Sequence, residues 1–254
     1  MSHAAATDDL EGTDRPVLIA CSHGTDNPQG QAVISHLVGQ VRELLPDVEV
    51  LETYVDVQYP QVDEVVNCVA AGRAVVVVPL LLSGGFHVNV DIASAVAFRA
   101  STGSPTVAAA PLGPDPRLAS ILVDRLDAAG ALPGDAVVVA AAGSSDAAAA
   151  VDVEQVAAEV AASWEGPVSV GYAASAAPRV AVATDLARSE LGGPEHGRVA
   201  LATYLLAPGF FTKRLAEAGA DLMAEPIGAH PLVAQIIVDR FTEALALLPT
   251  PVDS

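Results

Sequence analysis

The chain has 254 residues, of which 52% are hydrophobic, and a formal net charge of −19 from 12 basic and 31 acidic residues. The hydrophobic share excludes a disordered or fibrous protein, and the acidic balance argues against binding to nucleic acid or to an anionic membrane surface. The longest charge-free apolar stretch, residues 74–82, is too short to cross a bilayer. We therefore expect one large globular domain or two small ones, with no membrane partner.

The N-terminal segment, residues 1–14, is polar and acidic. It lacks the basic and apolar regions of a signal peptide. We expect a disordered tail and a cytoplasmic protein. The two cysteines, Cys21 and Cys68, show no disulfide or metal-binding spacing, so we expect both to be buried apolar side chains.

Apolar and amphipathic segments alternate along the rest of the chain. In the first half we expect strands at 16–22, 48–55, 74–83 and 105–110, and helices at 29–45, 60–72, 90–100 and 115–129. In the second half we expect strands at 136–142, 167–173, 198–206 and 221–224, and a final helix at 230–247. This alternation predicts an α/β protein with parallel sheets flanked by helices.

The chain also repeats itself. Residues 17–26 recur 120 residues later at 137–146, residues 81–87 recur 124 residues later at 205–211, and residues 111–116 recur 115 residues later at 226–231. Three similar offsets in the same order indicate an internal duplication. We expect two similar domains, 15–129 and 134–249, each with a four-stranded parallel sheet, joined where glycines and a proline interrupt the pattern.

Three polar residues follow predicted strands of the first half: His23, Asp56 and His87. Ligands of parallel α/β sheets bind beyond the carboxyl ends of the strands. In the alignment at the offsets above, the second-half counterparts are Gly143, Ala174 and Phe211. Groups present in one copy only are better explained by a single active site than by folding. Two imidazoles and a carboxylate suit a borderline divalent metal and acid–base chemistry.

Alternative roles exist for each of these features. A single strand-end histidine is often structural, and Asp56 could cap the helix expected near Pro60. The loop after His23 could present backbone N–H groups to an anion. Residues 83–86, Ser-Gly-Gly-Phe, would let a ligand approach the backbone, although an ordinary turn explains them as well. There is no phosphate-binding loop, and Ser144-Ser145 lacks a paired histidine, which argues against a nucleotide enzyme or a hydrolase.

At these residues the sequence resembles the class II chelatase family, specifically its long, two-domain sirohydrochlorin chelatases. The matching segments are 22–25 (SHGT), 54–60 (YVDVQYP), 77–82 (VVPLLL), His87 and 91–92. The resemblance is strong over residues 16–116 and fainter in the second half.

The resemblance implies insertion of a divalent metal into sirohydrochlorin, where Fe²⁺ gives sirohaem and Co²⁺ leads to cobalamin. Iron is our preferred assignment. The metal is a substrate, and no permanently bound cofactor is implied. The resemblance assigns metal binding and proton acceptance to His23 and His87, with assistance from Asp56. The family usually has Glu at that position, so the shorter Asp56 could act through a water molecule, or Glu52 or Asp91 could contribute. The substrate-binding residues would be Ser22, Gly24, Thr25, Ser83, Gly84, Gly85 and Phe86, in a cleft between the domains.

The tetrapyrrole partner carries many carboxylates, whereas this chain is strongly acidic. We therefore expect a local basic patch that includes Arg99, Lys213 or Arg214. The second half can occupy the place of a partner subunit, so we expect a monomer. A second interpretation is a non-catalytic carrier of metal or tetrapyrrole that uses the same cleft.

Overall fold

The computed structural model describes residues 15–84, 86–193 and 196–248, and of residues 86–89 it describes the backbone alone. The expected tail, residues 1–14, lies outside the described residues. None of the helices in the described part of the chain is long and apolar enough to span a membrane.

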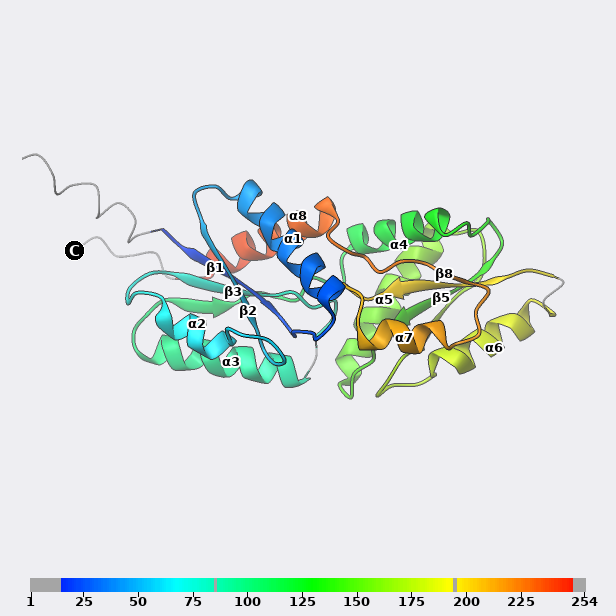
Figure 1. Ribbon diagram of the computed structural model, residues 1–254, viewed down its shortest axis with the longest axis horizontal. Helices are drawn as coiled ribbons and strands as arrows, with labels where there is room; N and C mark the ends of the chain where they lie inside the picture. The colour runs from blue at the N-terminus through cyan, green and yellow to red at the C-terminus, as the bar shows by residue number, and fades with distance from the viewer. Residues whose placement is uncertain (1–14, 85, 194–195, 249–254) are drawn as a thin grey trace, which may run out of the picture.

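The chain forms two four-stranded parallel sheets, as the alternating pattern predicts (Figure 1). The first sheet has the order β2-β1-β3-β4 and the second the order β6-β5-β7-β8. The strands are β1 (Val17–Ser22), β2 (Glu49–Tyr54), β3 (Val75–Pro79), β4 (Thr106–Ala108), β5 (Ala136–Ala141), β6 (Val168–Tyr172), β7 (Val199–Tyr204) and β8 (Leu222–Met223). The central strands β1, β3, β5 and β7 are buried along their whole length, which explains their unbroken apolar sequences.

The helices are α1 (Pro28–Leu44), α2 (Val62–Cys68), α3 (Phe86–Ser101), α4 (Pro116–Ala128), α5 (Ala147–Ser163), α6 (Val180–Glu190), α7 (Phe210–Ala216) and α8 (Pro231–Leu245). Most agree with the expected segments, but α2 is shorter and α3 begins four residues earlier than expected. His87 therefore lies in the first turn of a helix rather than in a loop.

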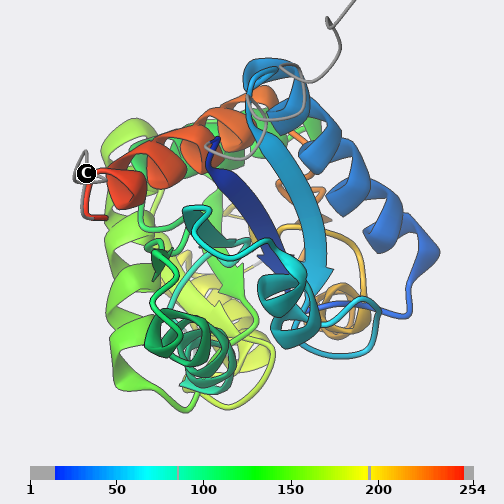
Figure 2. The ribbon, with the colours of Figure 1, turned by 90° about the vertical axis from the view of Figure 1, so that its left-hand side faces the viewer.

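The last helix of each half packs against the sheet of the other half. Helix α8 lies against helix α1 and against strands β3 and β4 of the first sheet. Helix α4 lies against helix α5 and against strand β7 of the second sheet. Figure 1 shows α8 in red over the first sheet and α4 in green over the second, and Figure 2 shows α8 on the same side of the first sheet as α1. Each sheet is therefore covered by one helix that comes from the other half of the sequence.

This exchange joins the apolar interior of the two halves. One cluster of buried side chains includes Leu18 and Leu37 from the first half, Val137 from the second, and residues of both exchanged helices, such as Leu122 and Ile237. Two smaller clusters cover the opposite faces of the sheets, one beneath α2 and α3 and one beneath α6 and α7. The shared core opposes separation of the halves, because separation would expose apolar surface to water.

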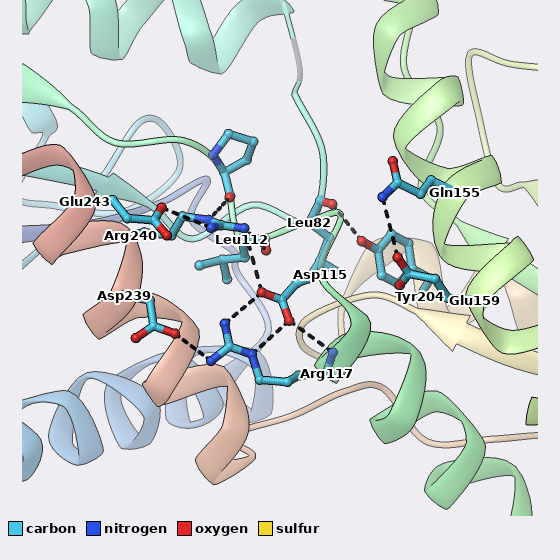
Figure 3. Close-up of polar contacts among 11 residues, drawn as sticks. Leu82, Leu112, Asp115, Arg117, Gln155, Glu159, Tyr204, Asp239, Arg240 and Glu243 are labelled. Atoms are coloured by element: carbon cyan, nitrogen blue, oxygen red, sulfur yellow. Dashed lines mark hydrogen bonds and ion pairs between the residues drawn. The ribbon is translucent and has the colours of Figure 1, made fainter.

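A polar cluster forms where the start of α4 lies beside α8 (Figure 3). The buried carboxylate of Asp115 caps α4 through the Arg117 backbone N–H and pairs with the Arg117 guanidinium at 2.7 Å. Arg117 also contacts Asp239 of α8 at 2.6 Å, and Arg240 of α8 donates to the carbonyl oxygen of Pro111. Burial alone would raise the pKa of Asp115, but hydrogen bonds from Arg117 and the charges of Arg117 and Arg240 hold that pKa below its usual value.

The structure corrects the register of the repeat by one residue in its first segment. Strand β5 begins 119 residues after β1 (136 against 17), and α5 begins 119 residues after α1 (147 against 28). His23 therefore corresponds to Ala142, and Gly24 corresponds to Gly143. Both glycines have positive φ, +93° and +89°, and an added Cβ at either would lie within about 2 Å of the carbonyl oxygen of Asp56 or Ala174. The contrast between the halves persists, because Ala142 carries no polar group either.

Candidate metal and tetrapyrrole site

His23 and Asp56 lie side by side just beyond the ends of β1 and β2. The parallel pairing of these strands continues past their ends, with Val55 N–H donating to Ser22 O at 2.9 Å and Asp56 N–H to His23 O at 3.0 Å. Both side chains are exposed to solvent. The sheet edge predicted from the sequence thus brings these two residues together.

Asp56 does not cap the following helix, because the N-cap of α2 is Gln61. Its Oδ1 accepts the N–H of Val57 at 2.7 Å. Val57 has a φ of +65°, a left-handed conformation that costs a β-branched residue free energy. The equivalent Ser175 has a φ of +54°, so the turn belongs to the fold of both halves, whereas the carboxylate belongs to the first half alone.

His87 follows β3 through residues 80–85 and lies in the first turn of α3. Its side chain, like that of Phe86, lies outside the described residues, as does Gly85. Among the side chains that the structure describes, no group of three His, Cys, Asp or Glu residues is arranged to hold a metal ion. The expected set of His23, Asp56 and His87 therefore stays a prediction.

The two other acidic candidates differ in their surroundings. Glu52 accepts hydrogen bonds from Tyr54 Oη at 2.5 Å and Ser35 Oγ at 3.1 Å. Asp91 is exposed on α3, and its charge acts on Cys21. Burial, with a smaller contribution from Asp91, raises the pKa of the Cys21 thiol to about 12, so this buried cysteine is protonated at neutral pH and is a poor metal ligand.

The strand-end segments of the first half meet those of the second. Gly84 N–H donates to Asp152 Oδ2 of α5 at 3.2 Å, and Tyr204 Oη of β7 donates to Leu82 O at 2.7 Å. In the symmetric contact, Gly30 of α1 lies so close to Pro208 that an added Cβ would be 2.4 Å from the Pro208 carbonyl oxygen. The halves thus face each other through the ends of their strands, where the cleft is expected.

Among the remaining expected substrate-binding residues, Ser22 is 4% exposed and its Oγ has no hydrogen-bond partner. Gly24 and Thr25 form the loop into α1, where Thr25 Oγ1 accepts the N–H of Asn27. Ser83 is half-buried beside Gly84. The roles of these residues in substrate binding stay predictions.

The expected basic patch loses one of its three members, and the roles of Lys213 and Arg214 stay predictions. Arg99 is buried at the opposite end of the strands, where it donates to the carbonyl oxygens of Ala70 and Arg73, so its assignment to the patch was wrong. Lys213 and Arg214 are exposed on α7. The Arg214 guanidinium lies 4.7 Å from the centre of the Phe210 ring, which is 61% exposed, and donates to Ala173 O after β6.

A hollow of about 840 Å³ lies elsewhere, along the outer edge of β2 beside α2. Its lining includes Glu49, Asp63, Arg73 and Cys68. Cys68 is exposed there, which corrects the expectation that both cysteines are buried. The hollow contains none of the strand-end residues, and we assign the site by the strand ends.

No role was predicted from the sequence for two glutamines near His23, although one of them, Gln58, stands in the segment 54–60. Gln58 Oε1 accepts the N–H of Thr25 at 2.9 Å, and Gln31 Nε2 donates to the carbonyl oxygen of Thr25 at 2.8 Å. In the corrected register their counterparts are Ala150 for Gln31 and Ala176 for Gln58. The same comparison between halves that identified Asp56 would have identified both.

Comparison with known proteins agrees with a duplicated chain. A family model described as CbiX matches twice, over residues 17–129 and 136–244. No curated protein matches significantly.

Three solved structures share the fold over nearly the whole chain. SirB from Bacillus subtilis with Fe³⁺ has a TM-score of 0.76 at 20% identity, covering 91% of this chain and 96% of that one. The sirohydrochlorin chelatase SirB from Bacillus subtilis subspecies spizizenii in complex with cobalt has a TM-score of 0.73 at 18% identity, covering 90% and 94%. CbiX, described as the terminal enzyme for biosynthesis of siroheme in denitrifying bacteria, has a TM-score of 0.64 at 22% identity, covering 90% and 99%. At these identities the likeness establishes the fold.

Proposed function

Because the chain belongs to the CbiX family of class II chelatases, in its long form with two domains in one chain, we propose that it inserts a divalent metal ion into sirohydrochlorin. We propose Fe²⁺ as the physiological metal, with Co²⁺ as the alternative, because related structures hold iron or cobalt. Imidazole and carboxylate ligands accept either ion, so metal supply decides between them.

One observation carries this proposal more than any other. In the first half, His23 and Asp56 are neighbours just beyond the carboxyl ends of β1 and β2. In the second half, the equivalent backbone positions are occupied by Ala142 and Ala174. The fold is thus kept in both halves and the polar groups in one. This pattern fits a single reaction centre between the two halves. The first half would supply its reactive side chains, and the second half would line the opposite side of the cleft.

The proposed roles follow from the chemistry of metallation. Two pyrrole protons must leave as the metal enters the ring, and histidine is the side chain whose protonation changes near neutral pH. His23 and His87 would hold the incoming metal on one side and accept the protons, and the Asp56 carboxylate would balance the charge of the metal. Ligands on one side leave coordination positions open, which allows release into the macrocycle.

The competing candidate is a carrier that binds metal or tetrapyrrole without turnover. It uses the same residues, so the two functions differ only in catalysis. The deciding experiment mixes sirohydrochlorin with Fe²⁺ or Co²⁺ under anaerobic conditions, with protein far below substrate concentration, and follows the absorbance of the macrocycle. We expect many turnovers per protein above the uncatalysed rate. A spectral change that stops at one equivalent of protein would instead establish the carrier.

The same assay tests the site. His23→Ala and His87→Ala should each lower kcat/KM by about 10²- to 10⁴-fold, the range for loss of a general base, with no loss of fold. His36→Ala is the matched control, because His36 is exposed on α1 away from the strand ends. A fully active His23→Ala or His87→Ala variant would disprove the assigned site.

A further inference from the structure

The Thr25 peptide, two residues after His23, is held on both sides by glutamine side chains. Gln58, from the loop after β2, accepts the Thr25 N–H, and Gln31, from the first turns of α1, donates to the Thr25 carbonyl oxygen. We call this pair of hydrogen bonds the Thr25 clamp. Both glutamines and Thr25 are half-buried, so water competes only partly for these bonds.

The second half shows that the fold does not need the clamp. Its equivalent loop keeps the other local contacts: Asp146 N–H donates to Ser144 Oγ as Asn27 N–H donates to Thr25 Oγ1. Ala174 N–H donates to Ala142 O as Asp56 N–H donates to His23 O. The glycine of the turn has the same positive φ in both halves. The loop therefore adopts its shape with alanines at both glutamine positions.

What the clamp adds is a second link between the two loops that carry His23 and Asp56, beside the backbone hydrogen bond from Asp56 N–H to His23 O that both halves share. Gln58 lies two residues after Asp56 and reaches the loop of His23. Together the Thr25–Gln58 hydrogen bond and the backbone hydrogen bond limit the movement of the two loops relative to each other.

The clamp also lies where the second half approaches. An added Cβ on Gly209 would be 3.5 Å from Thr25 Oγ1, and one on Gly30 would be 3.1 Å from the Thr25 methyl group and 2.4 Å from Pro208 O. The Thr25 peptide is thus fixed between the loop of Asp56, helix α1 and the segment before α7.

We propose that Gln58 and Gln31 are positioning residues for metal insertion: they fix the Thr25 peptide and so hold His23 in place beside Asp56. This inference rests on the proposed function, since positioning matters only if His23 acts on metal or substrate. Loss of a side chain that orients a metal ligand typically lowers metal affinity or activity by about 10- to 100-fold.

The first test replaces each glutamine by alanine. Gln58→Ala and Gln31→Ala should lower kcat/KM for Co²⁺ insertion, and the affinity of the metal-free protein for Co²⁺ by calorimetry, by about 10-fold or more. The matched control is Gln40→Ala, also on α1 and half-buried, whose Nε2 donates to Ala229 O far from His23. It should stay within about twofold of the wild type, and all three variants should unfold at similar urea concentrations. Full activity in both clamp variants would overturn the proposal.

The second test uses the opposite directions of the two hydrogen bonds. Gln58→Glu keeps an oxygen that accepts the Thr25 N–H, so it should retain most of the activity lost in Gln58→Ala. Gln31→Glu loses the N–H donor and sets a carboxylate against the Thr25 carbonyl oxygen, so it should be at least as impaired as Gln31→Ala. Both variants add one negative charge beside the same Thr25 peptide. Equal losses in the two would show that charge, not hydrogen bonding, is responsible.

Hydrogen exchange at the Thr25 amide separates this inference from the proposed function. Exchange should be faster in Gln58→Ala than in the wild type and Gln58→Glu, whether or not the protein turns over. If the wild type neither binds Co²⁺ nor turns over, the proposed function fails, and His23 has no metal to be positioned for. If the wild type is active but Thr25 exchange is unchanged in Gln58→Ala, the clamp fails alone.

Discussion

His23 and Ala142 occupy the same place after equivalent strands, and their carbonyl oxygens accept equivalent hydrogen bonds from Asp56 and Ala174. At the residue scale, the repeat therefore works as an internal control, because backbone features shared by both halves serve folding. Side chains found in one half need another explanation. By this criterion Gln31 and Gln58 belong with His23 and Asp56, and the Thr25 side chain, replaced by Ser144, does not.

A residue-scale prediction concerns the second half. Arg214 is the exposed cation on the Phe210 ring, close to the end of β6, and it can pair with a carboxylate of the macrocycle. Arg214→Ala should raise KM for sirohydrochlorin severalfold and leave KM for Co²⁺ unchanged. Steady-state assays with each substrate varied in turn measure both. The control is Arg188→Ala, because Arg188 pairs with Asp221 away from this surface. An unchanged KM for sirohydrochlorin would remove Arg214 from the site.

The sequence alone predicted the sheet edge that carries His23 and Asp56, because the predicted strands 16–22 and 48–55 end just before these residues. It misplaced the repeat by one residue at His23, since the segment 140–142 consists of three alanines and offers no side chain to fix the alignment. It placed Arg99 in the basic patch, although burial and four acceptors hold that side chain at the other end of the sheet. Amphipathic patterns do not reveal which end of a strand a neighbouring arginine reaches.

At the scale of elements, the exchange of α4 and α8 could not be read from the chain. An amphipathic pattern predicts that a helix covers an apolar surface, but either sheet offers one. The N-caps of these two helices could be recognised in the sequence, because they belong to the repeated segment at residues 111–116 and 226–231. In it, Asp115 precedes Pro116 and His230 precedes Pro231. Both residues accept an N–H of the first helical turn, at Arg117 and Leu232 respectively.

The His230 cap predicts a pH dependence of stability. His230 Nδ1 accepts the Leu232 N–H, which only a neutral imidazole can do. Burial and the charge of Arg125 lower the pKa of His230, with Asp124 acting in the opposite direction. A histidine pKa below its unfolded value near 6.5 stabilises the fold above that pH, and the stabilisation is lost as pH falls through the folded pKa.

His230→Asn keeps a capping side chain that does not titrate. The wild type should therefore lose about 1 kcal/mol more of its unfolding free energy between pH 7 and pH 5 than the variant does, the usual contribution of an N-cap. Urea unfolding at several pH values measures this difference, and chelatase activity should stay near that of the wild type. Parallel pH profiles would show that the cap does not depend on the protonation of His230.

At the scale of the whole molecule, the net charge of −19 acts oppositely on the two proposed substrates. The protein repels a carboxylate-rich macrocycle and attracts a divalent cation. Salt shortens the Debye length from about 30 Å at 0.01 M to about 8 Å at 0.15 M. Raising KCl over this range should therefore lower KM for sirohydrochlorin and raise KM for Co²⁺. Changes in the same direction for both would argue against control by long-range charge.

The shared core likewise predicts a monomer, because each sheet already has helices from both halves on one face. Light scattering should give a mass near 25.7 kDa that does not depend on protein concentration. A mass near twice that value would mean that a surface outside the shared core joins two copies.

The exchanged helices also determine when the protein can finish folding during its synthesis. The first sheet leaves the ribosome early, but the helix that covers β3 and β4, residues 231–245, is made after the entire second sheet. Until then, α1 covers this face of the sheet without α8 beside it, and contacts this distant in sequence form slowly. The nascent first half therefore cannot complete its core until residues 231–245 have left the ribosome, and it completes that core together with the second half.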